Sequence, residues 1–283
     1  MVLRTATRAV LLATVIAATM MPPAQAFDQA RYPDLHGQWR RAETGTFRFD
    51  PSKPWGPGQE APLSAEYQSI FDANLVSQAA GGQGIGVTYT CQSPGMPRVT
   101  NGYGPTEFVV TLETMHILVE NIYDSRRIYT DGRAFPEAFE PSLLGYSIGQ
   151  WIDLDGDGRY DELDVETRGF KGPRAYDASG IPLHRDNQSV VKERFFLDKT
   201  DPVILHDEVT VFDHALTRPW TVLKSYRRQS DPQPQWVEYV CNESNNHVHI
   251  GNENYMLSGD GMLMPTKKKQ RPPDLSLFAS PPK

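Results

Sequence analysis

The chain has 283 residues, with 28 Lys or Arg against 35 Asp or Glu, so its formal net charge is −7. An acidic chain without a basic stripe is not expected to bind nucleic acid or an anionic membrane surface. Beyond the N-terminal 26 residues, no segment approaches the roughly 20 apolar residues of a transmembrane helix, so no membrane span is expected.

Residues 1–26 have the pattern of a secretory signal peptide. Two arginines precede a short apolar run over residues 9–21, and an A-x-A cleavage pattern ends at Ala26. Cleavage after Ala26 removes both arginines, which leaves 26 basic and 35 acidic residues and a net charge of −9. We therefore expect a periplasmic or secreted protein, and an uncleaved N-terminal anchor is the alternative.

Residues 27–84 are expected to contain a short strand at 34–40, a Pro- and Gly-rich linker at 50–62, and one helix. Ser64 can cap this helix, and the glycines after residue 80 can end it. Its apolar stripe follows helical spacing and consists of Tyr67, Ile70, Phe71, Asn74 and Leu75.

Residues 85–250 are expected to form a β-rich core. Strand patterns recur at short intervals, at 107–112, 115–122, 126–130, 146–152, 162–170, 189–197, 203–212 and 220–227. Regular spacing and short turns predict an all-β fold, a mainly antiparallel barrel or sandwich. A short helix is expected at 236–243, and residues 251–283 form a C-terminal extension with a basic, Pro-rich tail.

The chain has two cysteines, Cys91 and Cys241. In an exported protein the oxidising compartment favours a disulfide between them, and two separate thiols are the alternative.

The strongest local pattern is a ladder of carboxylates between two expected strands. Its spacing matches ligand positions 1, 3, 5, 7, 9 and 12 of EF-hand-like calcium loops, where position 7 contributes a backbone carbonyl. The matched residues are Asp153, Asp155, Asp157, Arg159, Asp161 and Asp164. Carboxylates at this density repel one another without a cation, so Ca²⁺ is the expected cofactor. The strand-like flanks indicate a structural calcium that fastens a hairpin, and a solvated acidic turn is the alternative.

Glu193 is a candidate general acid or base. On an alternating strand its side chain shares a face with Val191, Phe195 and Leu197. A carboxylate among apolar neighbours either is suited to acid–base catalysis or is paired with a cation. The arginines available for such a pair are Arg126, Arg127, Arg133 and Arg194.

Arg127, Tyr129 and Asp131 alternate onto one face of an expected strand. Such a row either lines a polar binding site inside a barrel or forms a solvated outer face. With Arg133 and Arg194, Arg127 and Tyr129 are the candidate ligand-binding residues.

Two further candidates for chemistry lie near this strand run. His184 lies beside Asp186 in a polar loop, where it is either a proton shuttle or simply exposed. Ser147 lies in a G-x-S-x-G pattern, but the strand-then-helix context of a nucleophile elbow is missing. The candidate catalytic residues are therefore Glu193, His184 and Asp131.

Several motifs resemble a large family of exported bacterial proteins of uncharacterised function. The matching segments are 91–98, 126–133, 145–151, 165–170, 193–195, 217–220 and 239–243. The resemblance implies a β-rich exported domain and no particular activity. The acidic loop departs from the family pattern, in which a short turn joins the same two strands, and this favours a structural role for the metal.

Two functions are compatible with the sequence. A binding protein that holds a small molecule in the barrel predicts an apolar pocket with a few arginines. A lyase, isomerase or hydrolase acting on a small imported molecule predicts that Glu193, His184 and Asp131 converge. A calcium-stabilised structural protein of the cell envelope is a third hypothesis, and no feature predicts the oligomeric state.

Overall fold

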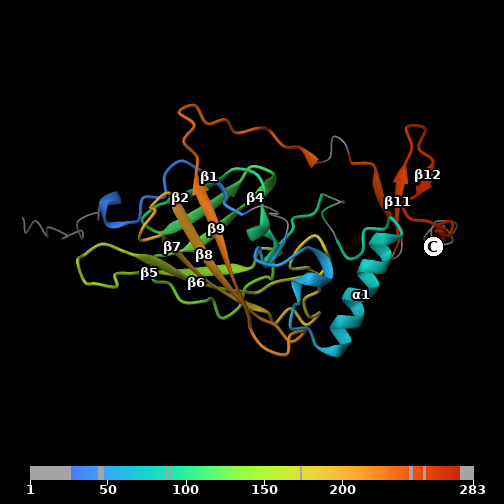
Figure 1. Cartoon of the computed structure of the whole chain (residues 1–283), viewed down its shortest axis with the longest axis horizontal. Helices are drawn as coiled ribbons and strands as arrows, with labels where there is room; N and C mark the ends of the chain where they lie inside the picture. Colours follow the sequence, from blue (N-terminus) through green and yellow to red (C-terminus); the bar gives the residue numbers. More distant parts are fainter. Residues whose placement is uncertain are drawn as a thin grey trace, which may run out of the picture.

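Nine consecutive strands form one closed barrel (Figure 1). The computed structural model describes residues 27–43, 48–86, 88, 91–172, 174–241, 245–250 and 253–274, so the expected signal peptide lies outside the described residues. The barrel strands are β1 (Gln38–Arg41), β2 (Thr106–Val110), β3 (Thr114–Val119), β4 (Ile122–Tyr129), β5 (Tyr146–Ile152), β6 (Glu162–Arg168), β7 (Val190–Leu197), β8 (Ile204–Phe212) and β9 (Trp220–Arg228). The predicted all-β fold is confirmed, and the barrel is realised rather than the sandwich.

Each strand pairs with its neighbours in sequence, and all pairings are antiparallel except that of β4 with β5. Parallel neighbours need a long connection that brings the chain back to the same end of the sheet. The 16 residues 130–145 between β4 and β5 provide this connection. β1 pairs with both β2 and β9, which closes the barrel and removes its free edges.

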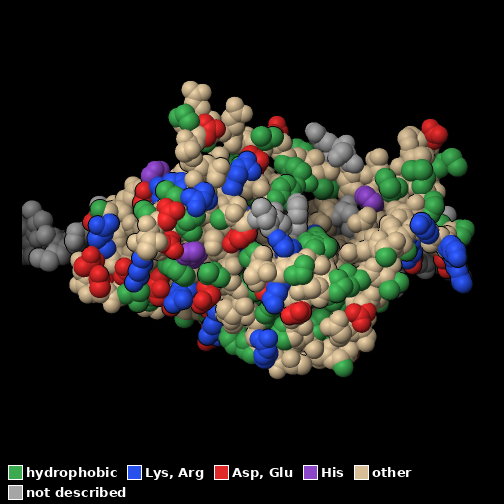
Figure 2. All heavy atoms as spheres, in the orientation of Figure 1, with side chains coloured by type: hydrophobic (Ala, Val, Ile, Leu, Met, Phe, Trp, Pro, Cys, Tyr) green, Lys and Arg blue, Asp and Glu red, His purple; other side chains and the backbone are tan. Residues whose placement is uncertain are grey.

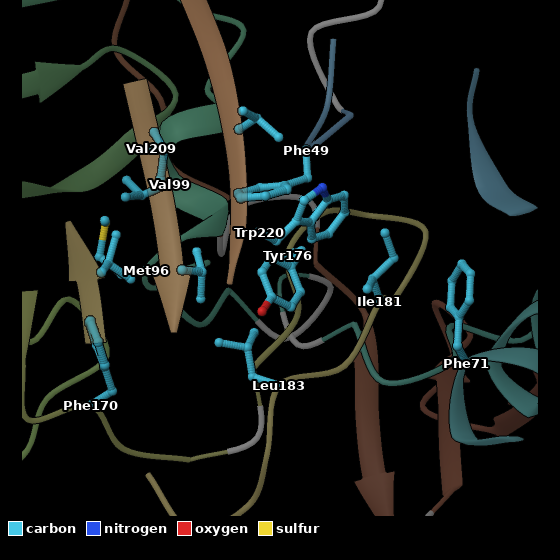
Figure 3. Close-up of a cluster of buried hydrophobic side chains, with 13 residues drawn as sticks. Phe49, Phe71, Met96, Val99, Phe170, Tyr176, Ile181, Leu183, Val209 and Trp220 are labelled. Atoms are coloured by element: carbon cyan, nitrogen blue, oxygen red, sulfur yellow. The ribbon is translucent and has the colours of Figure 1, made fainter. Parts of the chain in front are cut away.

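Alternation along the strands decides which side chains fill the barrel. In β8, every second residue from Leu205 to Val211 is buried, and the residues between them are more exposed. Most inward residues are apolar, and together with apolar residues outside the strands they form two clusters. The first cluster contains Trp39, Phe108, Met115, Ile128, Leu163 and Phe195 among others. The second contains Phe49, Phe71, Met96, Phe170, Tyr176 and Trp220 among others (Figure 3).

The predicted helix is confirmed as α1 (Ala65–Ala79). The Ser64 side chain caps its N-terminus by accepting the Tyr67 N–H, and Gly81 follows with a positive φ of 89°. Tyr67 and Phe71 are buried, and Phe71 belongs to the same apolar cluster as inward residues of the barrel. The helix therefore packs on the barrel as part of one core.

The short helix predicted at 236–243 is wrong for residues 236–240, whereas Cys241 has a 3₁₀ conformation and residues 242–243 lie outside the described residues. Residues 236–240 are extended, and their large side chains, including Trp236 and Tyr239, are exposed. The Val237 N–H donates to the Glu120 carboxylate at 2.9 Å, so this segment is held along the barrel instead of coiling.

The C-terminal part adds a small antiparallel sheet that was not predicted. Its strands are β10 (His247–Ile250), β11 (Glu253–Leu257) and β12 (Leu263–Pro265). It lies beside α1 (Figure 1), and the Lys268 N–H donates to the Ala80 carbonyl at 2.9 Å. Three short 3₁₀ helices are also present in the described residues: η1 (Gln29–Arg31), η2 (Gly56–Gln59) and η4 (Arg98–Asn101). None of the described helices has the length and apolar character needed to cross a bilayer.

The two cysteines lie at bonding distance, as predicted. The Cα atoms of Cys91 and Cys241 are 5.6 Å apart, and 150 positions separate the two residues in the chain. The disulfide joins the segment before η4 to the end of the extended segment 236–241.

Candidate functional site

Glu193 is buried inside the barrel and paired with Arg126. Two nitrogens of the Arg126 guanidinium donate to the two carboxylate oxygens, one of them at 2.7 Å, and both side chains are almost fully buried. Arg126 also donates to Thr167, whose hydroxyl lies 2.9 Å from that of Ser147. Of the two interpretations of Glu193, the ion pair is the one that the structure contains, and Arg126 is the partner.

Two more charged groups lie in the same interior layer. Asp207 and Lys224 are buried, and the Lys224 ammonium donates to the Phe49 carbonyl and to the side-chain oxygen of Asn101. Burial, and then repulsion from Glu193, raises the pKa of Asp207. Burial lowers the pKa of Lys224. Sequence reasoning missed both residues, although each interrupts an apolar alternation much as Glu193 does.

This layer encloses a small cavity of about 20 Å³, lined in part by Arg126, Asp207 and Tyr226. Asp207 Oδ1 and Arg126 Nε have no hydrogen-bond partner among the described atoms. The volume suits a single water molecule, which needs about 10–15 Å³ and polar partners. This interior cavity therefore has room for one water molecule and no room for a substrate.

The predicted row of polar residues on β4 faces outward. Arg127 is exposed, whereas its neighbours Arg126 and Ile128 are buried. Asp131 pairs with Arg133, whose guanidinium lies 4.0 Å from the centre of the Tyr129 ring. The hypothesis of a solvated outer face is the one realised, because side chains alternate along β4 and that of Arg126 points into the barrel.

Arg194 also lies on the outer face, beside a groove of about 490 Å³ over β5 to β8. Arg194 pairs with Glu208 at 3.2 Å, and Lys192 pairs with Glu166 at 3.4 Å. Acidic and basic side chains are interspersed over the barrel on the face shown in Figure 2. Most charged side chains of this groove thus have a partner of opposite charge, which leaves little to attract a charged ligand.

A second pocket, of about 330 Å³, lies beside the disulfide and is called here the disulfide pocket. Its walls come from four separate parts of the chain: residues 88–103 with η4, the start of β4, Ala178 between β6 and β7, and the segment after β9. The lining residues are Thr88, Cys91, Gln92, Pro94, Arg98, Asn101, Gly102, Tyr103, Asn121, Ile122, Ala178, Tyr239 and Cys241. Its volume lies within the usual range of small-molecule sites.

Arg98 is the one cationic side chain among these lining residues. It is half-buried, and its guanidinium donates to the Thr88 hydroxyl at 3.2 Å. No carboxylate of the described residues forms a salt bridge with it. Burial lowers its pKa, and the more distant Asp177 only partly opposes this. Arg98 is thus a desolvated cation that faces a cavity without a counter-charge in contact.

The disulfide pocket connects with the buried layer through η4. Gly102 lines both the pocket and the small interior cavity, and Asn101 lines the pocket while accepting a hydrogen bond from Lys224. Asn101 at the end of η4 and the adjoining Gly102 thus contribute to both the pocket and the buried layer. Neither Arg98 nor Asn101 was predicted as a site residue; the unusual density of Pro and Gly around them was the only local signal.

Ser147 is buried on β5 and is a packing residue. Its hydroxyl contacts Thr167, as described above, and no histidine is its partner. A Cβ at Gly149 would lie 2.8 Å from Ile128 and 2.9 Å from Leu163, and Gly145 has a positive φ of 72°. The G-x-S-x-G pattern is thus explained by close packing inside the barrel.

The acidic loop connects β5 and β6. Oxygen atoms of Asp153, Asp155 and Asp161 lie within 4.8 Å of one another. Asp157 and Asp164 do not belong to this group, and Asp164 lies on β6 opposite Gln150. The loop carboxylates accept backbone N–H groups of their own loop, including Gly156 and Gly158, which have positive φ. Part of the predicted ligand set converges, and calcium binding here stays a prediction.

His184 lies in the loop that precedes β7. It contacts Asp186, and Asp186 in turn contacts His214 from the turn between β8 and β9. Glu193 pairs with Arg126 and Asp131 pairs with Arg133, so none of the three predicted catalytic residues hydrogen-bonds with another.

No family model matches the chain, and no curated protein matches it at a significant level. The resemblance to the exported bacterial family stays a prediction.

Proposed function

We propose that this protein binds a small anionic molecule with an apolar body in the disulfide pocket. The observation that carries the proposal is the Arg98 guanidinium, which lines a cavity of about 330 Å³ and has no carboxylate in contact among the described residues.

The charge of Arg98 specifies the anionic end of the ligand. A partly buried guanidinium without a counter-ion is costly, and a carboxylate, sulfonate or phosphate that accepts two of its N–H groups offsets this cost. The described lining contains no acidic side chain that would repel such an anion.

The other walls specify the body of the ligand. Pro94, Ile122 and Ala178 supply apolar surface, and Tyr103 and Tyr239 are about half exposed at the pocket. Burial, followed by the neighbouring Tyr239, raises the pKa of Tyr103, and a hydrogen bond with Asn121 opposes this shift. Such a lining favours an aromatic or aliphatic ring system over a sugar or a metal complex.

The proposed setting is the periplasm or the extracellular space. The support is the paired cysteines beside the pocket, since a disulfide persists in an oxidising compartment. There the disulfide also holds two of the four pocket walls together.

The alternative of an acid–base enzyme has less support. It requires Glu193, His184 and Asp131 to act on one substrate, and each instead has its own ionic partner.

The proposal is tested by titrating the mature protein with 1-anilinonaphthalene-8-sulfonate, an apolar anion that fluoresces when it leaves water. We expect saturable binding of one probe per chain. Arg98→Met should weaken this binding about tenfold or more, because hydrogen bonds to charged groups contribute about 1.5–3 kcal/mol.

Two controls separate the effect of the Arg98 charge from nonspecific binding of the probe. Arg218→Met removes an exposed arginine elsewhere and should leave binding unchanged. The uncharged relative N-phenyl-1-naphthylamine should bind wild type and Arg98→Met alike. Equal binding of the sulfonate by Arg98→Met, with the near-UV circular dichroism preserved, would refute the proposal.

A further inference from the structure

A second cluster of chemically active side chains lies away from the disulfide pocket, on the loops at one end of β7, β8 and β9. It consists of His184, Asp186 and His214, whose ligand atoms all lie within 4.8 Å of one another. The Nδ1 atom of His184 is 3.0 Å from one oxygen of Asp186, and that of His214 is 2.5 Å from the other. The two imidazole rings meet edge to face, with their centres 5.6 Å apart.

We propose that His184, Asp186 and His214 bind a divalent transition-metal ion of the zinc class. Two imidazole nitrogens and one carboxylate oxygen are the donors that Zn²⁺ and its neighbours in the first transition row prefer. Ca²⁺ and Mg²⁺ prefer oxygen donors alone, so this cluster and the acidic loop differ in the ions that they select.

The hydrogen bonding of His184 is consistent with a shared cation. Its Nδ1 lies 3.1 Å from the backbone N–H of Asp186, so it can accept that proton, while an oxygen of the same residue faces it at 3.0 Å. A nitrogen lone pair and a carboxylate oxygen repel each other at this distance. Nδ1 has a single lone pair, so a metal ion would take the place of the Asp186 N–H on it; the ion would also remove the repulsion, since two ligands about 2.1 Å from one ion lie about 3.0–3.5 Å apart.

The backbone beneath the cluster is held by one carboxylate. Asp213 Oδ1 accepts the His184 N–H at 2.9 Å and the Ala215 N–H at 2.8 Å, which fixes both histidine-bearing loops relative to each other. Its other oxygen accepts the hydroxyl of buried Ser189, which in turn accepts a hydrogen bond from buried Arg174. The two loops are 30 positions apart in sequence, and this network keeps the ligands together without the metal.

The ring of His184 is oriented from the other side by α1. The Tyr67 ring lies against it with centres 5.1 Å apart, and the Tyr67 hydroxyl accepts the Arg185 N–H at 3.3 Å. The charged groups around the cluster nearly balance, since Arg174 and Arg185 offset Asp213 and Glu66. The negative charge of Asp186 is therefore not offset by these arginines, and it can attract the cation.

The exposure of the ligands predicts an open site. The side chain of His214 is 68 % exposed, and those of His184 and Asp186 are about 30 % exposed. Three protein ligands leave at least one coordination position for water or another molecule, whereas structural zinc sites are closed by four protein ligands. The ion is thus expected to exchange readily with solvent.

The test is isothermal titration calorimetry of the untagged mature chain with Zn²⁺, in the presence of excess Ca²⁺ to occupy oxygen-only sites. We expect one Zn²⁺ per chain. His214→Ala should weaken binding by about a hundredfold, since even loss of an outer hydrogen-bond partner of a ligand costs about 10- to 100-fold. Co²⁺ in place of Zn²⁺ should give a visible absorption band that His214→Ala loses.

His36→Ala is the matched control. His36 is also 68 % exposed and also contacts an aspartate, Asp34, but no second histidine joins that pair in the described structure. It should bind Zn²⁺ like the wild type, as should Asp155→Ala in the acidic loop. Absence of saturable binding, equal binding by His214→Ala, or an equal loss in His36→Ala would overturn the proposal.

Discussion

Single residues of the barrel interior are governed by the low polarity around them. Arg126, Glu193, Asp207 and Lys224 are all at most 3 % exposed, so each charge depends on a partner inside the protein. Arg126 and Glu193 provide this for each other, and the hydroxyls of Thr167 and Ser147 extend the network. Such a network favours the observed register of the strands over a shifted register, in which these side chains would lose their partners.

Breaking this buried pair should destabilise the protein strongly. Arg126→Met leaves the Glu193 carboxylate without its cation, and we expect a loss of about 3–5 kcal/mol in the free energy of unfolding. Replacing both partners, in Arg126→Met with Glu193→Leu, should recover most of this loss. Urea unfolding measures both. Lys192→Met breaks the exposed pair with Glu166 and should cost less than about 1 kcal/mol; a cost equal to that of Arg126→Met would contradict the argument.

Asp207 should make stability depend on pH. Its raised pKa means that the native state binds a proton more tightly than the unfolded chain does. Between the ordinary pKa of about 4 and the raised native value, the free energy of unfolding therefore falls as pH rises. Asp207→Asn removes this dependence, so its stability relative to wild type should increase with pH from 4.5 to 8 in urea unfolding. Parallel pH curves for the two proteins would show that Asp207 has no raised pKa.

At the scale of elements, the β5–β6 hairpin is the one with an unusual connection. Its loop bends at Gly156 and Gly158, and it also contacts the N-terminal segment, because the Tyr160 N–H donates to the Arg31 carbonyl at 2.7 Å. Carboxylates crowd its base, where burial and then the neighbouring Asp164 raise the pKa of Glu162. A cation in the loop would relieve this repulsion.

Calcium should therefore raise the melting temperature of the protein. A chelator is expected to lower it, and Asp155→Ala should abolish the difference between the two conditions, because a ligand that binds only the folded state stabilises it. Scanning calorimetry with Ca²⁺ or with EGTA measures the effect. Asp260→Ala, which changes an exposed aspartate outside the loop, should keep the full response. A wild-type melting temperature that ignores the chelator would exclude a bound calcium.

The whole molecule is held together by contacts between distant parts of the chain. β1 closes the barrel against β9, α1 joins the barrel core through Phe71, and the C-terminal sheet reaches back to Ala80. The Cys91–Cys241 disulfide adds a covalent link beside the proposed ligand pocket. Stability and the shape of the pocket are thus coupled at this scale.

Removing both cysteines should lower the stability of the folded chain. The disulfide closes a loop of about 150 residues, and loss of a native disulfide typically costs about 2–4 kcal/mol. Cys91→Ser with Cys241→Ser should show this loss in urea unfolding and should also bind the naphthalene sulfonate more weakly. Reduction of the wild type should have the same two effects, and unchanged binding in both cases would show that the pocket does not depend on the link.

The sequence by itself determined the elements of the barrel and the helix packed on it. Alternating apolar residues located the nine barrel strands, six of them within two residues of both observed ends, and the helical stripe located α1, whereas the C-terminal strands β10 to β12 were missed. It also showed that Glu193 lies among apolar residues and that arginines are available to pair with it. These features are local, because they depend on the periodicity of one segment.

Only the tertiary structure decided which residues meet. Arg126 and Arg127 are adjacent and point to opposite faces, and the phase of β4 depends on a register shift in its pairing with β3. Arg98 lines a pocket built from four segments of the chain. His214 lies near His184 only because the antiparallel pairing of β7, β8 and β9 places their two loops at the same end of the barrel. Such contacts arise from strand pairing and chain closure, which no local pattern of residues encodes.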